Sequence, residues 1–177
     1  MGETFKYLKI NIRLNDASNL QAYNLGLSDQ TGEQVFYFRP EESVSASIAD
    51  LNEDKKARKV VCKIVRLDDF VSKKKLKVDF IKCDVEGAEI LVFKGAIETI
   101  SKNKPIIFAE MLRKWSAKFA YHPNEIIKLL KNIDYDCFTI KDGSLKKLLK
   151  ITASTVETNF FFLHTKKHES KIRKLAA

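Results

Sequence analysis

Apolar positions along the chain switch between helix-like spacing and strand-like runs. Helical intervals predict helices over 4–15, from Leu67 onward, and over 88–94, 97–102 and 124–132. Alternating or continuous short apolar runs predict strands. These runs are 20–27, 34–39, 59–66, 78–83, 105–109, 135–140 and 159–164.

The order of these elements predicts the fold class. Strands and helices alternate in the second half of the chain, which favours an α/β fold with a mostly parallel sheet. The polar, serine-rich segment 40–59 is expected to be a loop, and Asp142-Gly143 is expected to be a turn.

The composition is that of one globular domain. The chain has 177 residues, of which 45% are hydrophobic and 31% charged, and this is enough apolar mass for one core. We expect a domain over 1–165 and a basic tail over 166–177. No apolar run reaches the ~20 residues of a membrane span, and the N-terminus is too polar for a signal peptide. Three distant cysteines give neither a disulfide framework nor a metal-type pair, so we expect a reducing, cytoplasmic location.

The net charge of +9 raises the question of anionic partners. Most of the basic residues are lysines in runs scattered along the chain. Proteins that bind nucleic acids use mainly Arg, with aromatic side chains between the basic residues. The hypothesis that this chain binds nucleic acid is therefore supported by its charge alone. We therefore expect a solvated basic surface and no nucleic-acid partner.

Acidic residues follow three of the predicted strands. Asp84 and Glu86 come after 78–83, Glu110 ends 105–109, and Asp29 follows 20–27. Ligands of α/β sheets bind at the carboxyl ends of the strands, which makes these residues candidates for a site. A structural interpretation stays open beside this one. Asp84 could cap the next helix, Glu86 could be a first-turn acid, Glu110 a surface residue and Asp29 a turn former.

Several sequence blocks resemble the FkbM-type methyltransferases. Residues 80–89 read FIKCDVEGAE, residues 94–96 KGA, and residues 104–110 KPIIFAE. Further matching blocks lie at 8–15, 26–29, 65–70, 133–138 and 159–162, so the resemblance covers nearly the whole chain in order.

This resemblance implies a Rossmann-like methyltransferase sheet and an S-adenosylmethionine-dependent enzyme. It implies O-methylation of a hydroxyl on a small molecule or glycan. Asp84, Glu86 and Glu110 would be catalytic residues on the acceptor side. Ser28, Asp29 and Asp84 would contact the cofactor.

The resemblance also implies that two strands are absent. The family's fold begins with a strand and a glycine-rich loop, followed by a strand that ends in an acid. None of the chain's glycines has the G-x-G spacing of such a loop. The absent strands would lie between 20–27 and 78–83. We expect 78–83 to be central, with 105–109 and 159–164 beside it, and the region 20–66 to pack poorly or rearrange.

Three explanations of the absent strands stay open. The chain could be a shortened version of the domain, or a partner chain or upstream segment could complete its sheet. It could also be a rearranged relative without catalysis, which serves as a binding or interaction module.

Overall fold

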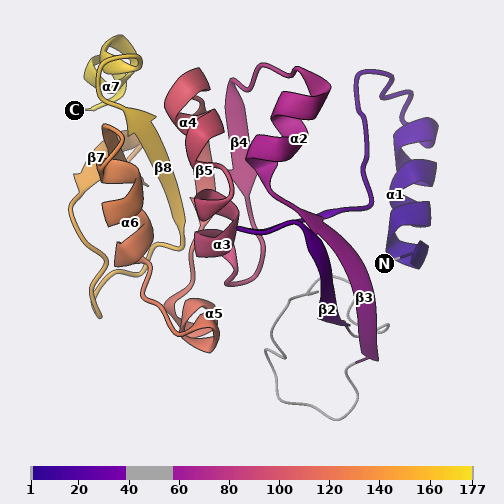
Figure 1. Ribbon diagram of the computed structural model, residues 1–177. Coiled ribbons are helices and arrows are strands. Elements are labelled where there is room, and N and C mark those ends of the chain that lie inside the picture. Colours follow the sequence, from indigo (N-terminus) through magenta and orange to yellow (C-terminus); the bar gives the residue numbers. More distant parts are fainter. Residues whose placement is uncertain (1, 39–57, 177) are drawn as a thin grey trace.

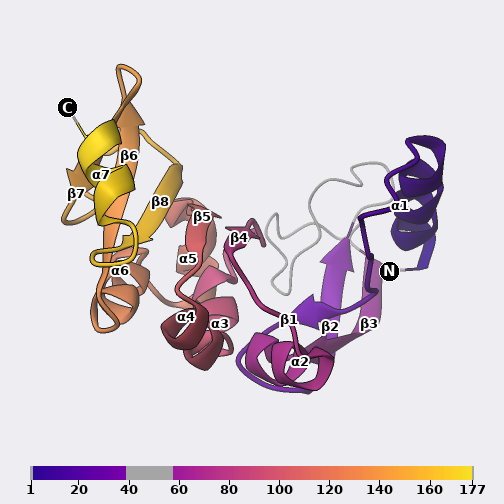
Figure 2. The same cartoon turned by 90° about the horizontal axis from the view of Figure 1, so that it is seen from above.

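The computed structural model describes residues 2–38 and 58–176, and these form two sheets with flanking helices (Figures 1 and 2). An α/β fold is therefore confirmed. Most of the expected loop 40–59 lies outside the described residues. Figure 2 shows the first helix at one end of the molecule and the last helix and strand β7 at the other.

The first sheet has three strands in the order β1-β3-β2. Helix α1 (Gly2–Leu14) precedes it in the chain. Its strands are β1 (Gly26–Leu27), β2 (Gly32–Phe38) and β3 (Arg58–Val65). β1 runs parallel to β3, and β2 runs antiparallel to it. Only the end of the predicted strand 20–27 is a strand. β1 pairs with β3 only through Gly26 and Leu27, which lie opposite Ile64 and Val65.

The second sheet has five strands in the order β4-β5-β8-β6-β7. Their bounds are Phe80–Cys83 (β4), Ile106–Glu110 (β5), Tyr135–Lys141 (β6), Ser144–Leu148 (β7) and Asn159–His164 (β8). β4 and β5 are parallel, whereas the other three pairings are antiparallel.

The sheet is therefore mixed, and the prediction of a mostly parallel sheet is wrong. A two-residue turn joins β6 to β7, with Asp142 at φ 51° and Gly143 at φ 76°. Such left-handed pairs make tight hairpins, which are antiparallel by construction. The lysine-rich sequence of β7 gave no strand signal.

The expected central place of β4 is also wrong, because β4 is an edge strand. β5 lies beside it as expected, but β8 lies beside β5 instead. The predicted order relied on strands bordering β4 on both sides. Among the described residues β4 has one neighbour, and β1 belongs to the other sheet.

Helices cover the two faces of the five-stranded sheet unequally. Three helices pack on one face, where the main core lies (Figure 1). They are α3 (Glu89–Lys94), α4 (Ile97–Asn103) and α6 (Asn124–Lys131). On the other face, α7 (Glu169–Leu175) places Ile172 against Phe138, Leu145 and Leu163. α5 (Arg113–Ser116) and the 3-10 helix η1 (Ala117–Phe119) connect β5 to α6.

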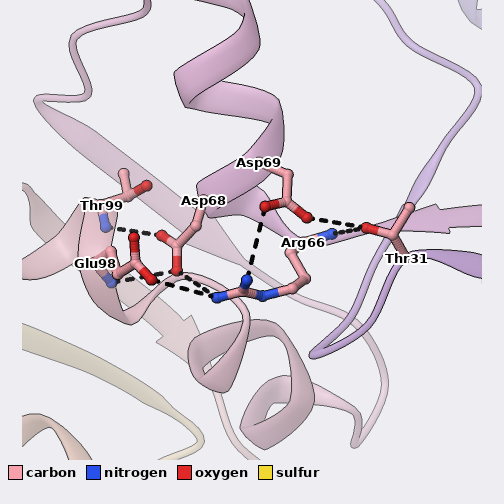
Figure 3. A network of polar contacts seen from close by, with 6 residues as sticks. All are labelled: Thr31, Arg66, Asp68, Asp69, Glu98 and Thr99. Carbon is pink, nitrogen blue, oxygen red and sulfur yellow. Dashed lines mark hydrogen bonds and ion pairs between the residues drawn. The ribbon is translucent and has the colours of Figure 1, made fainter.

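The two sheets meet through a buried carboxylate at the start of α2 (Leu67–Lys74), shown in Figure 3. Asp68 Oδ1 accepts a hydrogen bond from the Thr99 N–H at 2.8 Å, and Oδ2 accepts one from Glu98 at 3.3 Å. Arg66 donates to the same carboxylate at 3.2 Å. No side chain next to α4 in sequence caps it, so Asp68 supplies the missing cap from another helix.

A neighbouring contact attaches the turn after β1 to the same place. The Thr31 hydroxyl accepts the Arg66 N–H at 3.3 Å and donates to Asp69 at 3.1 Å (Figure 3). The three-stranded sheet is thus joined to α2 and, through Asp68, to α4.

Two buried histidines hold the end of β8. The N–H of His164 donates to His168 Nδ1 at 3.0 Å, and His164 Nδ1 accepts N–H groups from Lys166 and Lys167. Burial lowers the pKa of both imidazoles, and the charges of Lys104 and Lys167 lower the pKa of His164 and His168 further.

Within residues 2–38 and 58–176, no helix combines the length and apolar character that crossing a bilayer requires.

We predict that Asp68→Ala lowers the free energy of unfolding by ~1–3 kcal/mol, because it removes a helix cap and leaves buried N–H groups unpaired. Asp69→Ala is the matched control. Asp69 is exposed, lies 3.7 Å from Arg66 and accepts one exposed hydrogen bond from Thr31, so its loss should cost about 1 kcal/mol or less. Urea unfolding of both variants measures the difference, and equal losses would contradict the role of Asp68.

We predict that acid destabilises the fold through the two buried histidines. Their pKa values are lowered in the fold, so the unfolded chain binds these protons more readily and stability falls as pH drops below ~6.5. His168→Asn keeps an acceptor near the Nδ1 position but cannot titrate, so it should weaken this pH dependence. His122→Asn is the control, because His122 is exposed and accepts the Asn124 N–H. Urea unfolding across this pH range should show a shallower slope for His168→Asn alone.

Candidate functional site

The loop Asp84–Gly87 leaves β4 through two consecutive residues in left-handed conformations. Glu86 has φ 52° and Gly87 has φ 100°. A Cβ at Gly87 would lie 2.7 Å from the carbonyl oxygen of Trp115 and 3.0 Å from the Phe119 ring. Glycine is required here for both its backbone conformation and its size, and the loop lies directly against α5 and η1.

Three predicted carboxylates come together at this end of the sheet. Cys83 of β4 pairs with Ala109 of β5, so Asp84 and Glu110 follow at the same end of neighbouring parallel strands. Burial raises the pKa of Glu86, and the charges of Asp84 and Glu110 raise it further. The strand-end rule singled out four acids, and the structure brings three of them to one place.

Asp84 is held by Lys82, a residue of the preceding strand. Lys82 Nζ donates to Asp84 Oδ2 at 2.6 Å, and this hydrogen bond raises the pKa of the lysine. Asp84 does not cap α3, because the cap position is Ala88 and no side chain bonds there. The structural interpretation of Asp84 as a helix cap is thus wrong.

Glu89 is a site residue that the sequence reasoning did not single out. Its side chain is buried, Oε1 accepts the Gly87 N–H at 2.9 Å, and Oε2 accepts the Tyr121 hydroxyl at 3.0 Å. The signal for it was an acid at the start of an otherwise apolar helix, AEILVF. Burial, together with the Glu89 charge, raises the pKa of Cys83, so this thiol stays protonated and unreactive.

Ser28 and Asp29 lie at a different place, at the end of β1. Ser28 is buried, its hydroxyl donates to Asp29 Oδ1 at 3.2 Å, and its N–H donates to Val65. The Ser28 carbonyl oxygen packs against Gly95, so closely that a Cβ there would overlap it. Gly95 ends α3, whereas Asp84 and Glu86 precede that helix. The two groups of predicted residues therefore lie beside opposite ends of α3.

Two aromatic side chains border the carboxylate loop. Trp115 and Phe119 are half-buried, and their segment contacts Gly87. Lys114 Nζ lies 4.3 Å from the centre of the Trp115 ring. Trp115 belongs to α5 and Phe119 to η1, so a short helical segment adjoins the carboxylate loop.

We predict that Gly87→Ala destabilises the chain more than Gly143→Ala. Both glycines have positive φ, but a Cβ at Gly143 meets nothing within 4 Å. The control Gly143→Ala should therefore lower the free energy of unfolding by ~1–2 kcal/mol, because of its backbone conformation alone. Gly87→Ala should lower it by a further ~1–3 kcal/mol, because the added Cβ overpacks against Trp115. Equal losses in urea unfolding would show that the loop can move away from α5.

The chain is similar to a methyltransferase FkbM from Methylobacillus flagellatus, with 19% identity and a TM-score of 0.47. The match covers 89% of this chain and 32% of that one, so the chain spans about a third of its length. No curated protein matches the sequence. The model of the methyltransferase FkbM domain matches residues 3–137, and the chain therefore belongs to the FkbM methyltransferase family.

Proposed function

We propose that this domain transfers a methyl group from S-adenosylmethionine to a hydroxyl of a small molecule or glycan, in a Rossmann-like arrangement and in the cytoplasm. The observation that carries the proposal is the meeting of Asp84, Glu86 and Glu110 at the carboxyl ends of two adjacent parallel strands. In a member of this family, such a cluster suits an acceptor site.

The residues present fit one side of the cofactor. Its sulfonium is positively charged, and the three carboxylates provide negative charge where it would lie. Ser28 and Asp29 would contact the adenine side, and Asp84 would lie on the sulfonium side. The chain has no G-x-G spacing to hold the methionine part, so we expect this chain alone to bind S-adenosylmethionine weakly or not at all.

Positioning and proton removal are the tasks of the chain's own residues. The bound cofactor supplies an activated methyl group, so placing the acceptor accounts for most of the catalysis. Asp84 or Glu86 would orient the hydroxyl and take its proton. The raised pKa of Glu86 supports this role, because a base with a raised pKa holds the abstracted proton better. Lys82 fixes Asp84 and does no chemistry.

A second candidate is a binding module whose sheet is completed by a partner chain or an upstream segment. The favouring observation is the edge position of β4, where Phe80 is 54% exposed. Parallel strands are ordinarily covered on both faces, and an open strand edge accepts another strand.

The test of the proposed function compares Asp84→Asn with the wild type in methyl transfer. Labelled S-adenosylmethionine is supplied at millimolar concentration with a panel of hydroxyl acceptors, because weak binding is expected. If Asp84 orients or deprotonates the acceptor, turnover should fall by ~10²–10⁴-fold, far more than the cofactor affinity that calorimetry measures.

Asp79→Asn is the matched control. Asp79 also follows a lysine by two residues and pairs with Lys77 at 3.7 Å, but it precedes β4. Its turnover should equal that of the wild type. Equal turnover of Asp84→Asn would move the catalytic role to Glu86, and the absence of transfer by the wild type would favour the binding module.

A further inference from the structure

The buried carboxylate of Glu89 has no part in the proposed chemistry, and its burial needs a reason. Only 1% of the residue is exposed. In the part of the chain that the structure describes, no Lys, Arg or His forms an ion pair with it. A carboxylate removed from water is costly unless hydrogen bonds compensate. Both of its oxygens are accordingly bonded, one to Gly87 and one to Tyr121.

The first bond fixes the peptide group that follows Glu86. The N–H of Gly87 belongs to this peptide, and Glu89 Oε1 accepts it at 2.9 Å. A non-glycine residue at φ 52°, such as Glu86, persists only where its surroundings determine the backbone. Holding the peptide therefore holds the direction in which the Glu86 side chain leaves the loop.

The second bond fixes Glu89 itself. The Tyr121 hydroxyl donates to Oε2 at 3.0 Å, and the Tyr121 N–H donates to Ser116 of α5. Burial is the main cause that raises the pKa of Tyr121, and the negative charge of Glu89 raises it further. The hydroxyl therefore keeps its proton and remains a donor at any physiological pH.

We infer that Glu89 is a positioning residue of the site: clamped by Tyr121, it holds the Glu86–Gly87 peptide so that the Asp84 and Glu86 carboxylates face one acceptor position. The functional part of this inference rests on the proposed methyl transfer, whereas the positioning part concerns the chain alone. Neither Glu89 nor Tyr121 touches the acceptor.

Three variants separate the hydrogen bonds from the charge. Glu89→Ala removes both, Tyr121→Phe removes the clamp, and Glu89→Gln removes the charge but keeps an oxygen acceptor for the Gly87 N–H. Tyr135→Phe is the matched control, since it deletes another buried tyrosine hydroxyl, which donates to the Pro105 carbonyl at 2.8 Å. Hydrogen exchange of the Gly87 amide and titration of the Glu86 carboxyl are followed by NMR on the full chain.

Glu89→Ala and Tyr121→Phe should speed exchange at Gly87 about tenfold relative to the Ile107 amide of the core, as expected for loss of one hydrogen bond. The pKa of Glu86 should fall in both as the loop admits water. Glu89→Gln should keep exchange at Gly87 as slow as in the wild type. The pKa of Glu86 should nevertheless fall in this variant, because the negative charge of Glu89 is gone. Tyr135→Phe should change neither measurement.

The inference is overturned if Gly87 exchange in Glu89→Ala and Tyr121→Phe matches the wild type, or if Glu89→Gln exchanges as fast as Glu89→Ala. Should Tyr121→Phe unfold globally, all amides would exchange faster together, and the comparison of Glu89→Ala with Glu89→Gln decides. An absence of methyl transfer by the wild type would count against the proposed function and leave these measurements unaffected.

Discussion

The arrangement of the two sheets depends on the carboxylate of Asp68. The first N–H groups of α4 have no capping side chain next to them in sequence, and Asp68 satisfies two of them from the start of α2. These bonds form only when the two helices lie side by side, and Arg66 connects the same carboxylate to the end of β3. Apolar packing is non-directional, so this polar contact sets the orientation that the core alone would leave loose.

Local signals in the sequence predicted the elements that depend on local physics. The helix opened by Pro123 ends within one residue of its expected boundary, and Asp142-Gly143 makes the expected turn. Strand order was predicted poorly, because pairing depends on which strands are near in space. β4 thus lies at an edge, most of 20–27 pairs with nothing in the sheet, and β7 forms from a lysine-rich segment through its hairpin.

The candidate site was also predictable only where its residues follow from local sequence and strand ends. Asp84, Glu86 and Glu110 were expected together, because the carboxyl ends of parallel strands share one edge of a sheet. Glu89 was not, because its importance comes from burial and from Tyr121, which lies far along the chain. The separation of Ser28 and Asp29 from the carboxylates follows from where α3 begins and ends, which residue spacing alone does not specify.

The two edges of the five-stranded sheet differ in a way that limits self-assembly. β7, at one edge, carries Lys146 and Lys147, and Lys147 pairs with Asp136 on the neighbouring strand. Charged lysines on an edge discourage the addition of a further strand. β4, at the other edge, exposes Phe80 and is bordered by one strand in the described part of the chain. Of the two edges of this five-stranded sheet, the β4 edge is therefore the one suited to main-chain pairing between copies, and such pairing would leave the lysine-bearing β7 edges outermost.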